Sequence, residues 1–257
     1  TEKNGNALFS AAAGNERSAD TKTADIENNS EVRIIKKWDL PGELKEVSGI
    51  AYLDEQRFAC VQDEEGSIFV FNTASNSIER KIAFGDPGDF EDIAVIGDIA
   101  YVLRADGKIF EANIKHNGGK ATEHNTSLTV EHNVEGMCYD QANKRLLLAI
   151  KDDEPGKPDF KGIYAFDLSK KTFVKEPAYK LDLKNELLRS PGKKKDKTIK
   201  PSAIGIHPTT NDIYIVDGPE AKLLVMDNSG KIKRMLELGK DFSQPEGIAF
   251  GEQGEIF

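Results

Sequence analysis

The chain has 257 residues, of which 38% are hydrophobic and 31% charged, with a formal net charge of -9 and a pI near 5.1. These values are typical of an ordinary soluble protein with one substantial core. They argue against a nucleic-acid surface as the main partner, because phosphate binding needs a concentrated positive face. No apolar run approaches the roughly 20 residues that a membrane-spanning helix requires.

Residues 1–30 are rich in Asn, Ser, Ala, Thr and charge, and they lack a period that could bury one face. We therefore expect a disordered leader or tether. The chain begins at Thr1 without methionine, and a polar leader before a compact domain suits an exported protein whose signal has been removed. Such leaders often follow a lipid-anchored cysteine, so we expect an exported, periplasmic or outer-surface lipoprotein with its anchor upstream of residue 1.

From residue 31 to residue 257 one pattern recurs. A strand of small and branched residues is followed by a polar turn, a second strand, a Gly or Pro break, and then a third and a fourth strand. The repeats open at Ser48, Glu91, Glu135, Ser202 and Glu246, in steps of 43, 44, 67 and 44 residues. Four strands every 40 to 45 residues, roughly, is the spacing of β-propeller blades. We expect an all-β chain with a single β-propeller of five four-stranded blades over residues 31–257, or of six as the alternative.

Two segments depart from the repeat. The longest step holds a surplus at residues 181–200, which we interpret as a basic insertion with a short helix and a loop. The fifth repeat ends at Phe257 after two strands, and we expect the strand-like stretch 31–40 to close the last blade as its outer strand. One strand is then missing, so we expect the natural chain to continue, or unseen sequence to complete a sixth blade.

The residues that open the repeats are candidates for a site, because the first strand of each propeller blade lines the central channel. We expect a ring at one mouth of the channel, here called the channel ring, formed by Ser48, Glu91, Glu135, Ser202 and Glu246. Three carboxylates around one cavity raise one another's pKa unless a cation or basic groups compensate. Calcium takes six to eight oxygen ligands, so Glu91, Glu135 and Glu246 are our candidate metal ligands.

The second strand of each repeat ends at the same mouth and supplies further candidates for binding. Aligning "CVQD", "VLRA", "AIKD" and "YIVD" places at one level Gln62, Arg104, Lys151 and Val216, and at the next Asp63, Ala105, Asp152 and Asp217. Arg104 can then pair with Glu91, and Lys151 with Glu135. Three states of the mouth stay open: a bound cation, a closed network of ion pairs, or a small anionic or polar ligand on Arg104 and Lys151.

The sequence resembles the SdiA-regulated family of bacterial propellers, which are related to NHL-repeat proteins. The resemblance covers residues 31–257 and rests on "EVSGIAY", "GDFEDIAVIGDIAYVLRADGKIFE", "EGMCYDQANKRLLLAIKDD", "KPSAIGIHPTTNDIYIVD" and "QPEGIAF". It implies a bacterial exported or envelope-associated propeller, sometimes with a metal such as calcium at the channel.

A more distant resemblance is to calcium-dependent lactonases of the gluconolactonase and regucalcin kind. Their "EG" dipeptide at a channel strand provides a metal-ligating Glu, and Glu135 and Glu246 match it here. Val216 and Arg104 stand where the companion Asn and Asp ligands would be expected. This departure argues against lactonase activity.

Two functions remain open. We favour a noncatalytic exported propeller that binds a small ligand or an envelope protein at its channel face, with calcium or an ion-pair ring organising the mouth. The sequence has no G-x-S-x-G, phosphate-cradling Gly loop or paired Cys motif. The alternative is a metal-dependent hydrolase, lactonase-like or phosphoesterase-like, whose cation polarises a carbonyl while a ring carboxylate activates water. A closed ring lacks free sheet edges, so we expect a monomer.

Overall fold

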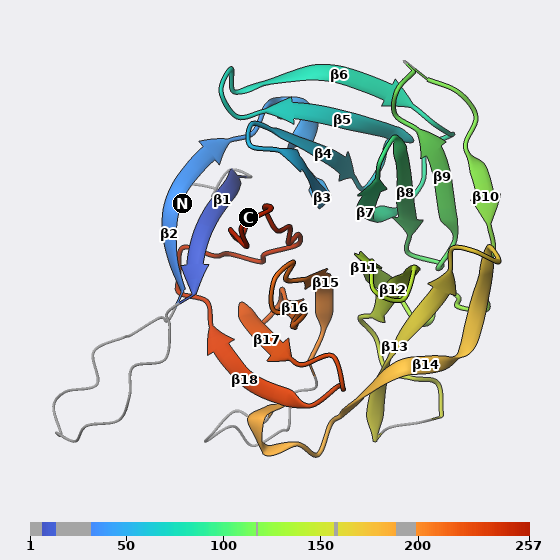
Figure 1. Ribbon diagram of the computed structural model, residues 1–257, viewed down its shortest axis with the longest axis vertical. Helices are drawn as coiled ribbons and strands as arrows, with labels where there is room; N and C mark the ends of the chain where they lie inside the picture. Colours follow the sequence, from blue (N-terminus) through green and yellow to red (C-terminus); the bar gives the residue numbers. More distant parts are fainter. Residues whose placement is uncertain (1–6, 14–31, 117, 157–158, 189–198) are drawn as a thin grey trace, which may run out of the picture.

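The computed structural model describes residues 7–13, 32–116, 118–156, 159–188 and 199–257, which form β-strands and two short 3-10 helices. Four four-stranded antiparallel sheets are arranged around a central axis as the blades of a β-propeller (Figure 1). Within each blade the strands are hydrogen-bonded in chain order, with the first nearest the axis. Across these ranges, no helix has the length and apolar character needed to cross a membrane. The predicted all-β propeller architecture is confirmed.

The blades are numbered in chain order. Blade 1 contains β3 (Val47–Asp54), β4 (Arg57–Gln62), β5 (Ser67–Asn72) and β6 (Ser77–Ala83). Blade 2 contains β7 (Phe90–Ile96), β8 (Ile99–Arg104), β9 (Ile109–Asn113) and β10 (Thr122–His124). Blade 3 contains β11 (Val134–Asp140), β12 (Arg145–Ile150), β13 (Phe160–Asp167) and β14 (Thr172–Asp182). Blade 4 contains β15 (Pro201–Ile206), β16 (Ile213–Asp217), β17 (Lys222–Met226) and β18 (Ile232–Glu237). The 3-10 helices are η1 (Gly42–Leu44) and η2 (Glu186–Leu188).

The fifth position around the axis is filled by segments from both parts of the chain that flank the blades. β1 (Ala7–Ala13) pairs antiparallel with β2 (Val32–Asp39), and Ala11 forms a bridge with Ile256 of the segment 246–257. We call β1, β2 and this last segment the closing unit (Figure 1). The predicted count of five or six four-stranded blades is therefore wrong: four are complete, and the fifth position holds a two-stranded sheet joined to the last segment by an isolated bridge.

The disordered leader predicted over residues 1–30 is wrong for Ala7–Ala13, which form β1. Leu8 and Ala11 of this strand are buried in the apolar clusters on its two sides. Its sequence, "ALFSAAA", has no alternation of apolar and polar residues, so only the tertiary contacts show that it is a strand. β1 lies between the segment 246–257 and β2, which takes the outer place predicted for residues 31–40.

The predicted insertion at residues 181–200 is described in part. Its first residues, Leu181 and Asp182, end β14, and η2 supplies the short helix. The basic run lies among residues 189–198, which are outside the described residues.

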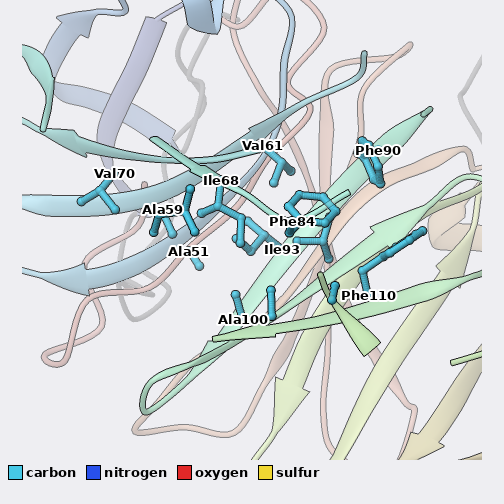
Figure 2. Packing of buried hydrophobic residues seen from close by; sticks show 14 residues of the cluster. Ala51, Ala59, Val61, Ile68, Val70, Phe84, Phe90, Ile93, Ala100 and Phe110 are labelled. Atoms are coloured by element: carbon cyan, nitrogen blue, oxygen red, sulfur yellow. The ribbon is translucent and has the colours of Figure 1, made fainter. Parts of the chain in front are cut away.

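Apolar side chains fill each junction between neighbouring blades. Figure 2 shows the junction of blades 1 and 2, where Val61, Ile68 and Phe84 pack against Phe90 and Phe110. The rings of Phe84 and Phe90 make an edge contact with centroids 5.0 Å apart. Four similar clusters fill the other junctions. Burying each such large side chain stabilises the fold by about 1.5–3 kcal/mol, so the junctions hold the ring together.

The first strand of every blade carries a β-bulge at the same place. The ladder between the first and second strands shifts by one residue there, which leaves unmatched Ser48, Glu91, Glu135 and Ser202. A bulged residue leaves the regular alternation of the strand, and its side chain is re-aimed. The four channel-ring residues that belong to blades are therefore all bulged residues.

Candidate functional site: the channel mouth

Glu135 has the best-defined surroundings of the predicted ligands. Glu135 is 8% exposed, and both of its carboxylate oxygens lie 2.7 Å from Nζ of Lys151. Nδ2 of Asn133 donates a further hydrogen bond of 2.9 Å to Oε1. Burial raises the pKa of Glu135, while the bonds from Lys151 and Asn133 oppose that shift. The predicted pair between Glu135 and Lys151 is formed.

Glu91 and Glu246 share the electrostatic environment of Glu135. Burial, and then the negative charge of Glu135, raises the pKa of Glu91 to about 9. The same two causes, in the same order, raise the pKa of Glu246, and Lys151 opposes both shifts. Because Glu246 is itself solvent-exposed, burial acts less strongly on it than on Glu91, which is only partly exposed. A carboxyl group with a pKa near 9 keeps its proton at neutral pH. Glu91 and Glu246 are thus close enough to Glu135 and Lys151 for the charges of these residues to affect their ionisation.

Lys151 stays charged in this surrounding. Burial acts to lower its pKa, but the bond to Glu135 and the charges of Glu91 and Glu246 outweigh burial and raise the pKa. Its side chain is 25% exposed, so the ammonium lies at the boundary between the carboxylates and solvent. The ammonium of Lys151 therefore interacts electrostatically with three acids.

Further carboxylates lie beside the channel ring. Asp63, predicted as a binding residue, has a buried Oδ1 that accepts no hydrogen bond from any described residue. Burial raises the pKa of Asp63, and the charges of Glu46 and Glu64 add to this. The charges of Asp63 and Glu46 in turn raise the pKa of Glu246. This side of the mouth has an excess of negative charge.

Three residues of the mouth were missed from the sequence: Glu46, Asp89 and Asn133. Asp89 forms a hydrogen bond with Glu91, which requires a proton between the two carboxyl groups. All three stand two positions before a channel-ring residue, and their carbonyls accept equivalent bonds from the N–H groups of Asp63, Ala105 and Lys151. Extending the aligned repeats backwards by two residues would have found them.

The channel-ring serines bond to the backbone of the next unit. Oγ of Ser48 donates to the carbonyl of Phe90 at 2.7 Å, and Oγ of Ser202 donates to the carbonyl of Pro245 at 2.8 Å. Both carbonyls belong to the residue that precedes a ring glutamate. The serines therefore join neighbouring units and help to place Glu91 and Glu246; their predicted ligand-binding role stays a prediction.

Arg104 does not make the predicted pair with Glu91. Its guanidinium holds Asp106 through bonds of 3.0 and 2.6 Å and lies over the ring of Phe110. The strand register explains the error, because Arg104 pairs with Phe90 in blade 2, whereas its equivalent in blade 3 is Ile150. Lys151 is one position further along, and a shift of one residue turns a side chain to the other side of a strand.

The remaining two predicted binding residues have partners of their own. Asp152 is half-exposed and lies 3.4 Å from the ammonium of Lys200. Asp217 is buried, and its carboxylate accepts backbone N–H bonds from Glu220 and Lys200. Burial raises the pKa of Asp217, and these backbone bonds oppose the shift. Asp217 therefore caps a turn of blade 4.

A fully buried lysine, Lys161, bonds to the backbone of Lys151 at the mouth. Nζ of Lys161, at the start of β13, donates a 2.5 Å hydrogen bond to the carbonyl of Lys151. Burial lowers the pKa of Lys161, and the charges of Asp153 and Asp152 oppose this. The sequence signal for this residue is a lysine at the start of the otherwise apolar strand "KGIYAF", where blade 1 has Gly66 and Ser67.

The donor chemistry of the mouth suits calcium, but its present arrangement does not. Across the described parts of the chain, no three His, Cys, Asp or Glu side chains are grouped so that they could hold a metal ion. In addition, Glu135, the best-defined candidate ligand, has its oxygens engaged by Lys151 and Asn133. Calcium would therefore require Glu135 to release its partners.

Two open surface hollows lie away from the mouth. One is at the turn between β3 and β4, and the other is beside Arg145 and Val174 of blade 3. Both are at the end of a blade opposite the channel ring, and neither is lined by a residue of the mouth. The convergence of charges, and not the size of a hollow, thus identifies the candidate site.

Comparisons with known proteins agree with this fold. Among solved structures, the chain is similar to hydrazine synthase of Kuenenia stuttgartiensis, with a TM-score of 0.54, 11% identity, and coverage of 86% of this chain and 81% of that chain. It is also similar to a nidogen/laminin complex (TM-score 0.54, 16% identity, coverage 86% and 73%). For virginiamycin B lyase from Staphylococcus aureus the TM-score is 0.50 at 15% identity, and the match covers 82% of this chain and 62% of the lyase.

At these identities the likenesses concern the fold alone. No curated protein sequence matches the chain. The model of one family, described as SdiA-regulated, matches residues 23–257, which include every blade and β2. The chain therefore belongs to the SdiA-regulated family.

Proposed function

We propose that this propeller is a noncatalytic binding protein whose channel mouth takes up a positively charged group of a small ligand or of an envelope protein. The observation that carries the proposal is the ion pair between Glu135 and Lys151, together with the mutual influence of Glu91, Glu135, Glu246 and Asp63 on one another's ionisation. Burial and mutual repulsion disfavour the charged form of these acids, so some retain protons at neutral pH.

A bound cation would relieve this repulsion in place of the protons. An organic ammonium needs only a few oxygen acceptors, for which the ring carboxylates and Oδ1 of Asp63 are the candidates. Calcium, as the family resemblance implies, would need more oxygens and the release of Glu135. Binding of either cation would displace a proton from Glu91, so affinity should rise with pH up to the pKa of that group, about 9.

The test is calorimetric titration of the purified protein with methylammonium chloride and with calcium chloride, at constant ionic strength and at pH 6.5 and 8.5. We expect tighter binding at the higher pH, and proton release that shows as a dependence of the heat on the buffer. The double substitution Glu91→Gln, Glu246→Gln should abolish binding. The matched control is Glu55→Gln, an exposed acid at the opposite end of blade 1. A wild-type protein that binds neither cation would refute the proposal.

A metal-dependent hydrolase, lactonase-like or phosphoesterase-like, stays the second prediction. It needs a carboxylate that accepts a proton from water. Glu135 is engaged by Lys151 and Asn133, and the pKa of Glu91 keeps that group protonated at neutral pH. These observations favour binding over hydrolysis. Turnover of a lactone or phosphoester panel in calcium, lost in Glu91→Gln, would replace the binding proposal by the hydrolase.

An exported, envelope-bound location belongs to the same proposal, since a partner in the envelope requires it. Fractionation of the native cells with an antibody to the propeller would check this. Recovery in the membrane fraction, with release by detergent, is expected for a lipid-anchored protein. Recovery in the cytosol would contradict it.

A further inference from the structure

We propose that the ammonium of Lys151 is a tethered cation, which fills the cation position of the channel mouth and is displaced when an external cation binds. The inference takes its ligand class from the proposed function and adds a residue that limits access and affinity. Lys151 would thus be an internal competitor built into blade 3.

The geometry of the pair resembles the binding of a ligand. Nζ of Lys151 is equidistant from the two oxygens of Glu135, at 2.7 Å, and Asn133 adds a bond to one of them. The charges of Glu91 and Glu246 also act on this ammonium. One positive group therefore already neutralises Glu135, the most enclosed of the three ring carboxylates, where an external cation would be strongly attracted.

The backbone of Lys151 is held on both sides. Its N–H donates to the carbonyl of Asn133 at 2.8 Å, and its carbonyl accepts the 2.5 Å bond from the buried Lys161. Burying a lysine is costly unless it makes such bonds, so Lys161 fixes this point of the chain. With the backbone fixed, the ammonium of Lys151 can leave Glu135 only by rotation of its own side chain, which is reversible and needs no movement of a blade.

The equivalent positions show that the tether is a feature of one blade. The N–H groups of Asp63, Ala105 and Lys151 make corresponding bonds in blades 1, 2 and 3. In blade 1 this position carries an acid, in blade 2 a methyl group, and in blade 3 the ammonium. Removing the ammonium therefore converts the mouth into an acidic site without altering the ladder of any blade.

The charges predict how the two probes differ. Methylammonium that replaces the Lys151 ammonium leaves the charge beside Glu135 unchanged, so the gain in free energy is small. Calcium adds a second positive charge but must first break the bidentate pair. In Lys151→Met the carboxylate of Glu135 is free, and calcium should bind about tenfold tighter or more than to the wild type, on the scale measured for close charge pairs.

The experiment compares calcium binding to the wild type and to Lys151→Met, Lys151→Arg and Lys115→Met by calorimetry and by thermal unfolding at pH 7.5 and constant ionic strength. Lys151→Arg keeps the tethered charge and should bind calcium like the wild type. Lys115 pairs with Asp98 at 2.8 Å on an exposed surface, so its substitution controls for the loss of an ion-paired lysine. If Lys151→Met does not fold, Lys151→Gln, which retains a hydrogen-bond donor, takes its place.

Tighter calcium binding and a larger calcium-dependent rise in Tm, confined to the variants that lack the charge at residue 151, would support the tethered cation. Equal affinity in all four folded proteins would overturn it, even if the wild type binds calcium well and the proposed function stands. Binding seen in Lys151→Met but not in the wild type, for calcium and methylammonium alike, would support the tether while refuting the proposed function.

Discussion

The hydroxyl of Ser48 donates a 2.7 Å hydrogen bond to the carbonyl of Phe90, across the junction of blades 1 and 2. Ser202 makes the equivalent bond from blade 4 to Pro245. Because each accepting residue directly precedes a ring glutamate, the two serines help to fix the backbone positions of Glu91 and Glu246. The channel ring thus consists of charged residues and of the residues that place them.

We expect Ser48→Ala and Ser202→Ala each to lower the free energy of unfolding by about 1 kcal/mol, since each removes the hydroxyl that donates to a carbonyl at a junction, buried at Phe90 and partly buried at Pro245. Cation binding should remain. Urea unfolding and calorimetry measure the two effects, with Ser75→Ala, an exposed serine, as the control. Lost binding at unchanged stability would instead show that these serines are ligand contacts.

The raised pKa of Glu91 predicts that the effect of substituting this residue on stability depends on pH. Since the folded pKa, about 9, is above the ordinary value of 4.5, the folded state holds a proton that the unfolded state has lost between these values. Stability from this group is therefore complete below about pH 4.5 and declines towards pH 9. Glu91→Gln mimics the protonated form, so we expect its Tm to exceed that of the wild type by roughly 2–6 °C at pH 8.5.

Well below pH 4.5, at about pH 3.5, the same variant should match the wild type, since Glu91 is then mostly protonated in both states. Thermal unfolding followed by circular dichroism across this range gives the difference. A gain that does not vary with pH would show that packing, and not ionisation, is responsible.

The close approach of β3 to β7 explains the glycine in "EVSGIAY". A Cβ added to Gly49 would lie 2.5 Å from Cα of Asp92, which is backbone and cannot turn aside. We expect Gly49→Ala to cost about 1–3 kcal/mol in the free energy of unfolding, as overpacking does. Gly85, whose added Cβ would meet nothing within 4 Å, provides the matched control. Equal stability of the two alanine variants would contradict this account of the motif.

Asp92 joins blades 2 and 3 through backbone bonds. It is 3% exposed; Oδ2 accepts the N–H of Met137 at 2.7 Å, and Oδ1 accepts the N–H of Ile93 at 2.8 Å. We expect Asp92→Leu to lower the free energy of unfolding by about 2–4 kcal/mol, because two buried donors lose their acceptor. Asp92→Asn keeps one acceptor and should cost less. Denaturant unfolding measures both, and the reverse order would contradict the assignment.

The ion pair at the mouth should be worth more than a surface pair. A double-mutant cycle of Glu135→Gln and Lys151→Met is expected to give a coupling of about 1–3 kcal/mol, because both groups are largely shielded from water. The equivalent cycle on Lys115 and Asp98, both more than half exposed, should give under about 0.5 kcal/mol. Similar values for the two cycles would show that the mouth screens charge as effectively as bulk solvent.

The sequence predicts the propeller and its ring because both follow from period and alternation. Glu91, Glu135 and Glu246 stand at the same point of successive repeats, so a propeller built on this repeat is expected to place them at one mouth. The partner of Glu135 was found for the same reason. The partner of Glu91 was not, because aligning "VLRA" with "AIKD" equated Arg104 with Lys151, whereas the ladders make Arg104 equivalent to Ile150. Neither composition nor period reveals such an offset of one residue in the second strand.

The segments that close the ring show a second limit of prediction from the sequence. Residues 7–13 have neither alternation nor bulky apolar residues throughout, and their strand exists because β2 and the segment 246–257 leave a place between them. Local propensity is a weak guide where tertiary pairing decides the conformation. The count of complete blades was wrong because the prediction gave the last blade four strands, with residues 31–40 as the outer one, whereas that position holds β1, β2 and an isolated bridge to Ile256.

The repeated bulge separates two requirements that a protein surface usually has to meet with the same residues. Each ring glutamate in a blade stands outside the ladder, so its side chain can be exchanged while the paired residues on both sides keep the blade intact. The mouth can therefore change its chemistry through single substitutions on a constant scaffold. A library randomised at positions 91 and 135 would sample new binding specificities while the ladders of both blades stay paired.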